Sequence, residues 1–130
     1  MENDHPDLKF KSSGTDAVYL ANVNIFFGVL FGLNVFIHDW REDKLGSQSV
    51  LQKCIDWFRQ MYEGGLLGNR LHIAARHTAR KDLDVQIQKI LHYVAIFGDE
   101  ADITALLNSG VVTRRSSKRT RKVTKPVTTN

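Results

Sequence analysis

The run AVYLANVNIFFGVLFGLNVFI, residues 17–37, is the longest stretch of the chain without a charged side chain. Its length and apolar character suit a helix that crosses a hydrocarbon layer, or one buried within protein on every side. Asn22, Asn24 and Asn34 weigh against the hydrocarbon layer, because an unpaired amide there costs on the order of several kcal/mol. The run therefore predicts a helix that needs protein partners.

Small residues recur along one side of this run. At about 100° per residue, five positions fall on a single stripe of the helix: Ala17, Ala21, Asn24, Gly28 and Gly32. A stripe of small residues lets a second backbone approach closely. We therefore predict that these five residues form an oligomerisation surface.

Hydrophobic residues recur at three- and four-residue intervals over most of the remaining chain, which indicates helices. No strand-like alternation persists beyond a few residues. The sequence predicts an all-α fold, a helical bundle of three main helices over about residues 16–39, 47–63 and 70–97. A short fourth helix is expected over about residues 99–108.

Polar residues and glycines mark the expected helix ends. Thr15 or Asp16 suits the start of the first helix, and Ser47 or Ser49 suits the start of the second. Asp99 suits the start of the fourth. Gly64 and Gly65 are expected to end the second helix, because glycine commonly follows the last turn.

Composition favours one globular domain, with 42% hydrophobic and 25% charged residues. We expect an irregular N-terminal arm over residues 1–14 and a helical bundle domain over residues 15–110. A basic tail over residues 111–130 is expected to be disordered unless bound, because it has too little apolar surface to fold alone.

The positive charge is concentrated in two places. The tail holds a block of basic residues with no acidic residue among them: Arg114, Arg115, Lys118, Arg119, Arg121, Lys122 and Lys125. The predicted third helix carries Arg70, Arg76, Arg80 and Lys81 on the side opposite its apolar face. Since all 14 acidic residues lie outside the tail block, both basic regions are candidates for binding a polyanion or an acidic partner.

The sequence offers little support for catalysis or metal binding. It contains no GxSxG, P-loop, GxGxxG or HExxH pattern, so we expect a protein that is not an enzyme and holds no cofactor or metal. Cys54, the single cysteine, excludes an intrachain disulfide, and its apolar neighbours predict that it is buried.

These observations favour a non-enzymatic, self-assembling helical protein. Its first helix would pack between subunits, and its basic tail would contact acidic neighbours or a polyanion. One alternative is a nucleic-acid-binding accessory protein that reads no sequence, because the tail has no aromatic residues to stack on bases. Another is a membrane protein anchored by residues 17–37. The leading interpretation predicts a cytoplasmic homo-oligomer, and the last predicts a membrane location.

Overall fold

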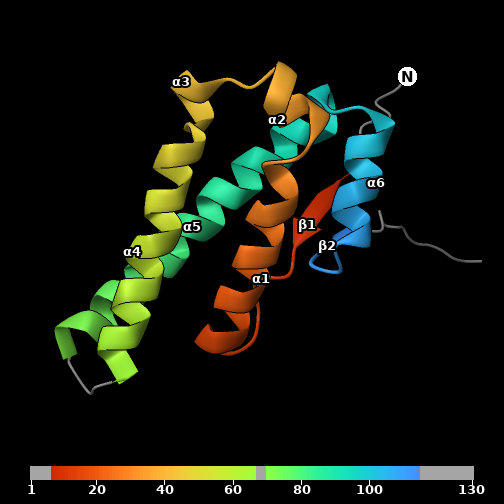
Figure 1. Cartoon of the computed structure of the whole chain (residues 1–130). Coiled ribbons are helices and arrows are strands. Elements are labelled where there is room, and N and C mark those ends of the chain that lie inside the picture. The colour runs from red at the N-terminus through yellow and green to blue at the C-terminus, as the bar shows by residue number, and fades with distance from the viewer. Residues whose placement is uncertain (1–6, 67–69, 115–130) are drawn as a thin grey trace, which may run out of the picture.

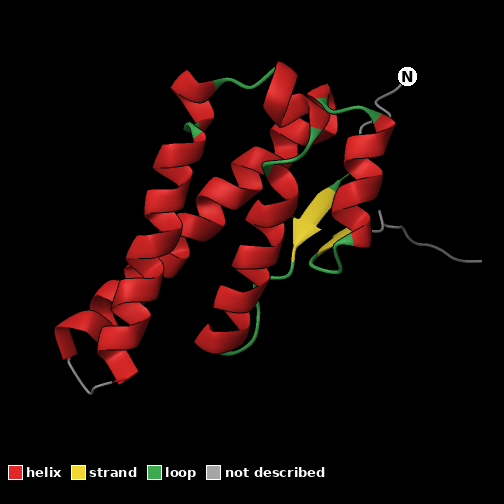
Figure 2. Ribbon diagram, viewed as in Figure 1, coloured by secondary structure: helices red, strands yellow, loops and turns green. Residues whose placement is uncertain are grey.

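A computed structural model describes residues 7–66 and 70–114 (Figure 1). The chain is mostly helical, which confirms the predicted all-α bundle, and two short strands form a small sheet beside the helices (Figure 2). The helices are α1 (Asp16–Leu30), α2 (Asn34–His38), α3 (Glu42–Leu45), α4 (Gln48–Leu66), α5 (Arg70–Phe97) and α6 (Glu100–Asn108). The strands are β1 (Leu8–Phe10) and β2 (Val112–Arg114).

Helices α4 and α5 form an antiparallel hairpin, and α1 lies against it (Figure 1). The apolar stripe of α4 faces inward and is buried at Leu51, Ile55, Phe58 and Met61. The matching stripe of α5 is buried from Ala79 to Val94. The bounds of α5 are those that the periodicity predicted. The core therefore forms where the three longest helices meet.

The helix expected over residues 16–39 is interrupted. α1 ends at Leu30, and Leu33 adopts an extended conformation with φ −72° and ψ 147° before α2 begins. The backbone N–H groups of Asn34 and Val35 donate to the carboxylate of Asp102 at 2.8 and 3.0 Å. This distant carboxylate stabilises a second helix start inside the apolar run, so the prediction of one continuous helix was wrong.

Gly64 and Gly65 do not end α4, which continues to Leu66. A glycine inside a helix costs only about 1 kcal/mol relative to alanine, so packing of α4 against α5 can outweigh it. Ser47 rather than Ser49 begins α4, since its Oγ accepts from the Val50 N–H at 3.3 Å. The capping residues in the sequence thus predicted the start of α4 more accurately than the glycines predicted its end.

The predicted caps of the first and fourth helices are confirmed. The hydroxyl of Thr15 accepts a hydrogen bond from the Val18 N–H at 3.2 Å. The carboxylate of Asp99 accepts from the Asp102 N–H at 2.8 Å, and Asp102 reaches back to the Asp99 N–H at 3.3 Å. This reciprocal pair is a capping box, and it fixes the start of α6.

The two strands join opposite ends of the described chain. β1 pairs antiparallel with β2, with Leu8 opposite Arg114 and Phe10 opposite Val112. The apolar residues at this junction are buried: Leu8, Phe10, Val111 and Val112. Residues 8–10 are therefore not irregular, and residues 111–114 belong to the folded body. The rest of the predicted tail lies outside the described residues.

Candidate functional site

The outer face of α1 is a part of the apolar run that the described residues leave uncovered. α1 buries Tyr19, Val23, Phe26, Phe27 and Leu30 against the body. The five stripe residues, in contrast, are all exposed: Ala17, Ala21, Asn24, Gly28 and Gly32. The structure therefore brings the predicted oligomerisation residues together on one open face. We refer to this face, together with Val18 and Ile25, as the α1 face.

The α1 face is apolar and uncharged, which is unusual for the solvent side of a helix. Val18 is 48% exposed and Ile25 is 44% exposed. Asp16 is the only charged residue of α1, and it lies at the first turn. The residues that the structure describes do not bury α1 on every side, because they cover only its inner face.

Over residues 7–66 and 70–114, no contact accounts for glycine at position 28. A Cβ atom added to Gly28 would meet nothing within 4 Å, and one added to Gly32 would meet only the Val29 carbonyl oxygen at 3.6 Å. Gly28 lies inside α1, where glycine is less favourable than alanine by roughly 0.5–1 kcal/mol. Its small size is therefore not needed for packing within the described part of the chain.

The three asparagines of the apolar run have different surroundings. Asn22 donates through Nδ2 to the Lys11 carbonyl at 3.3 Å, and Asn34 donates through Nδ2 to Asp99 at 3.0 Å. Asn24 is exposed on the α1 face, and its amide has no hydrogen-bond partner among the described residues. One amide of the run thus remains available on the α1 face.

Two of the predicted polyanion-binding residues are engaged within the chain. Arg80 Nη1 lies 2.7 Å from Asp16 Oδ1, and Arg76 Nε lies 2.8 Å from Asp16 Oδ2 without the alignment of a hydrogen bond. Arg80 Nη2 also donates to the carbonyls of Ser12 and Gly14, at 2.6 and 3.0 Å. These two arginines hold the start of α1 against α5, which makes them poor candidates for a polyanion site.

The same cluster contains a tyrosine and a second carboxylate. The Arg80 guanidinium lies 4.3 Å from the centre of the Tyr19 ring. The Tyr19 hydroxyl donates to Asp84 Oδ1 at 2.6 Å. Burial, with a further contribution from Asp84, raises the pKa of Tyr19, and burial also raises the pKa of Asp84. The cluster is a structural junction between α1 and α5.

The other predicted basic residues are on the surface or beyond the described chain. Arg70, Lys81 and Arg114 are exposed. The remaining tail positions lie outside the described residues: Arg115, Lys118, Arg119, Arg121, Lys122 and Lys125. The described part of the basic surface is therefore smaller than the helix 70–97 pattern indicated.

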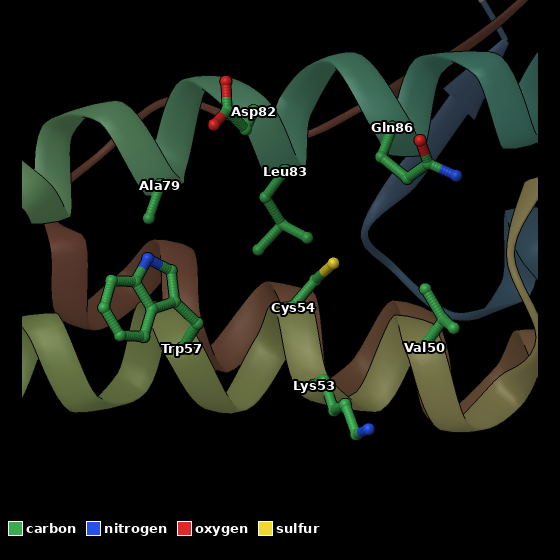
Figure 3. A pocket seen from close by; sticks show the side chains of 8 residues that line it. All are labelled: Val50, Lys53, Cys54, Trp57, Ala79, Asp82, Leu83 and Gln86. Carbon is green, nitrogen blue, oxygen red and sulfur yellow. The ribbon is translucent and has the colours of Figure 1, made fainter.

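A groove between α4 and α5 was not predicted from the sequence. It has a volume of about 440 Å³, and Figure 3 shows Val50, Cys54 and Trp57 along α4 opposite α5. Cys54 is exposed in this groove, so the prediction that it is buried was wrong. The broad apolar surface of α4 could have indicated the groove, because its core stripe does not include Val50 or Trp57.

The described residues give no sign of a metal centre or a membrane span. Over residues 7–66 and 70–114, no group of three or more His, Cys, Asp or Glu side chains is placed to hold a metal ion. No helix in the same part of the chain is both long enough and apolar enough to cross a bilayer.

Comparison of the chain with protein family models, with curated proteins and with solved structures finds no match.

Proposed function

We propose that the protein is a non-enzymatic subunit that associates with further copies of itself through the α1 face. The observation that carries this proposal is the exposed Gly28, because no contact among the described residues explains a glycine there. A closely approaching second backbone would supply such a reason.

The chemistry of the α1 face supports the same proposal. The face combines exposed Val18 and Ile25 with four small residues and no charge beyond the first turn. Covering apolar surface is favourable by about 25 cal/mol per Å². Asn24 adds an amide, which could pair across the interface with the same amide of a second copy. A partner helix would therefore gain apolar contact without having to bury a charge.

The basic tail is a second contact region in this proposal. The remainder of the chain is weakly acidic, because all 14 acidic residues lie outside the tail block. The tail could therefore bind acidic surfaces of neighbouring subunits or an enclosed polyanion. Such contacts would be electrostatic and would weaken as salt is added.

Substitutions at Gly28 test association through the α1 face. Gly28→Ala should stabilise the folded monomer against urea by roughly 0.5–1 kcal/mol, because alanine is the better helix former and has open space there. The same change should weaken association, and Gly28→Leu should weaken it further. Overpacking a close contact costs about 1–3 kcal/mol, which corresponds to roughly 5- to 150-fold in the dissociation constant.

Sedimentation and light scattering of nuclease-treated protein would measure the association. Ala101→Leu is a matched control, since Ala101 is an exposed small residue on a different helix. It should leave the oligomer unchanged. A wild-type chain that stays monomeric at high concentration, or a Gly28→Leu variant that associates like the wild type, would overturn the proposal.

A further inference from the structure

A row of aromatic rings reaches the surface where α2 and α5 end, away from the α1 face. We define the aromatic shelf as Phe36, Ile37, Trp40, Tyr93, Ile96 and Phe97. Successive ring centres lie 4.8 Å apart for Phe36 and Trp40, 5.4 Å for Trp40 and Tyr93, and 4.7 Å for Tyr93 and Phe97. Ile37 is 59% exposed, Ile96 is 50% exposed and Phe97 is 56% exposed. The four rings therefore form a continuous row that is partly in contact with solvent, and Ile37 and Ile96 are exposed next to them in the sequence.

Hydrogen bonds hold the two polar rings of the shelf in place. Trp40 Nε1 donates to the Gly46 carbonyl at 2.8 Å, and the Tyr93 hydroxyl donates to the Asp39 carbonyl at 2.5 Å. Both rings thus have their polar atoms satisfied while part of their apolar surface remains accessible. A ligand would meet ordered rings, which lowers the entropic cost of binding.

Acidic side chains predominate in the segments beside the shelf. The exposed carboxylates of the α2–α3 connection, of α3 and of the start of α6 are Asp39, Glu42, Asp43, Asp99 and Glu100. Only Arg41 and Lys44 oppose them there, and Arg41 already pairs with Asp43 at 3.5 Å. Aromatic faces attract Arg and Lys side chains, and carboxylates attract the same cations. The shelf and its surroundings therefore suit a basic segment that contains arginine.

β2 runs toward the end of α5 at which the shelf lies. β1 begins at Leu8, whose carbonyl accepts from Gln88, and the chain then reaches Ser12, whose carbonyl accepts from Arg80. β1 thus runs toward the start of α5. Because β2 is antiparallel to β1, it runs the opposite way, toward the end of α5 where the shelf lies.

The length of chain after β2 is sufficient to reach the shelf. α5 rises about 14 Å from the level of Gln88, which lies beside Leu8, to Phe97. Extended chain covers this rise in four or five residues. The rest of the eleven residues 115–125 must pass around α5, because Tyr93 lies about 140° around the helix from Gln88. Residues 115–125 are therefore long enough to reach the shelf. A segment tethered so near its site has an effective concentration in the millimolar range, so even a weak contact is populated.

We propose that residues 115–125 of the same chain lie across the aromatic shelf, with their basic side chains on the exposed rings and against the neighbouring carboxylates. The contact goes beyond the proposed self-association, because it involves a different surface and needs only one chain. It also implies competition: a polyanion must displace the tail from the shelf before it can bind the same charges.

Disulfide trapping in the full chain tests this placement. In a Cys54→Ser background, Thr120→Cys is combined with Ile37→Cys on the shelf, which keeps all basic residues of the tail. The matched control combines Thr120→Cys with Val85→Cys, because Val85 is 58% exposed. Val85 also lines the same hollow as Lys9 of β1, so it lies close to the strand that precedes the tail. If closeness to the start of the tail alone set the rate, the control pair would form its disulfide faster than the shelf pair.

The shelf pair should form an intrachain disulfide at least about tenfold faster than the control pair at low salt, and added salt should reduce the difference. Equal rates for the two pairs, or shelf disulfides that form only between chains, would overturn the proposal. The experiment is run at concentrations where sedimentation shows a monomer. Its failure would therefore leave association through the α1 face untouched.

Fluorescence of Trp40 gives a second measurement without cysteines. In a Trp57→Phe chain, Trp40 is the remaining tryptophan. Added salt should release the tail and shift its emission to longer wavelength. Replacing Arg115, Arg119 and Arg121 with glutamine should remove most of this shift. An identical salt response in the two chains would contradict the proposed contact.

Discussion

Arg80 joins the N-terminal segment, α1 and α5 through one side chain. Its guanidinium pairs with Asp16, donates to the carbonyls of Ser12 and Gly14, and lies over the Tyr19 ring. The loop before α1 is thus tied to α5 by charge-assisted hydrogen bonds, which are stronger than neutral ones. Removal of this side chain would leave several partners unsatisfied at once.

The environment of the Asp84 carboxyl group predicts how the stability of the fold depends on pH. Burial raises its pKa above the ordinary value of 3.8, so folding favours the protonated form. The wild type should therefore lose stability relative to Asp84→Asn as the pH rises from below 3.8 through the raised pKa. The asparagine oxygen can still accept the Tyr19 hydroxyl, and other carboxyl groups cancel in the comparison.

Urea unfolding of the wild type and Asp84→Asn near pH 3.5 and pH 7 would measure this difference. Asp84→Asn should be the relatively more stable protein at pH 7. A difference in unfolding free energy that is the same at both pH values would contradict the raised pKa.

The role of Arg80 could not have been predicted from its neighbours in sequence. Its position on the polar side of helix 70–97 indicated an open basic face, but its carboxylate partner Asp16 lies 64 residues away. Gly28 is the opposite case, because its exposure follows from the periodicity of one helix. The sequence thus predicted which residues share the outer side of α1, whereas it predicted part of the basic face wrongly.

At the scale of elements, Asp102 connects α2 to α6. It is 3% exposed, and its carboxylate accepts from the N–H groups of Asn34 and Val35 while completing the capping box of α6. Hydrogen bonds to a charged group contribute about 1.5–3 kcal/mol each. Asp102→Ala should therefore lower the free energy of unfolding by about 3 kcal/mol or more.

Asp43→Ala is the control for this change in urea unfolding. Asp43 is 68% exposed and pairs only with Arg41 among the described residues, so its loss should cost less than about 1 kcal/mol. Equal effects of the two substitutions would mean that the Asp102 hydrogen bonds contribute little.

Helix bounds were predictable where one local signal was sufficient. Periodicity placed α5 over residues 70–97, and Asp99 marked the start of α6. The break after Leu30 depends on Asp102, and β1 depends on a strand about a hundred residues later. Each strand has three residues, too few for alternation to be visible. The aromatic shelf likewise depends on rings from two separate helical segments.

At the scale of the whole molecule, the folded body ends with β2 rather than before it. A chain truncated after residue 110 loses Val111 and Val112, which are 4% and 2% exposed. It should be less stable by about 3 kcal/mol or more, since each buried valine contributes about 1.5 kcal/mol or more. A chain truncated after residue 114 should change by less than about 1 kcal/mol, and thermal unfolding would compare the two. Similar melting temperatures would show that β2 contributes nothing to the fold.

The pairing of Leu8 with Arg114 has a mechanical consequence. The start of β1 and the end of β2 lie at the same end of the two-stranded sheet. A force that pulls the two chain ends apart therefore acts perpendicular to the strands. It would open the residue pairs in succession, from Leu8 and Arg114 to Phe10 and Val112, instead of loading them all together. The residue pairs would separate one after another before the force acted on the helices. The molecule would therefore resist stretching poorly along this axis.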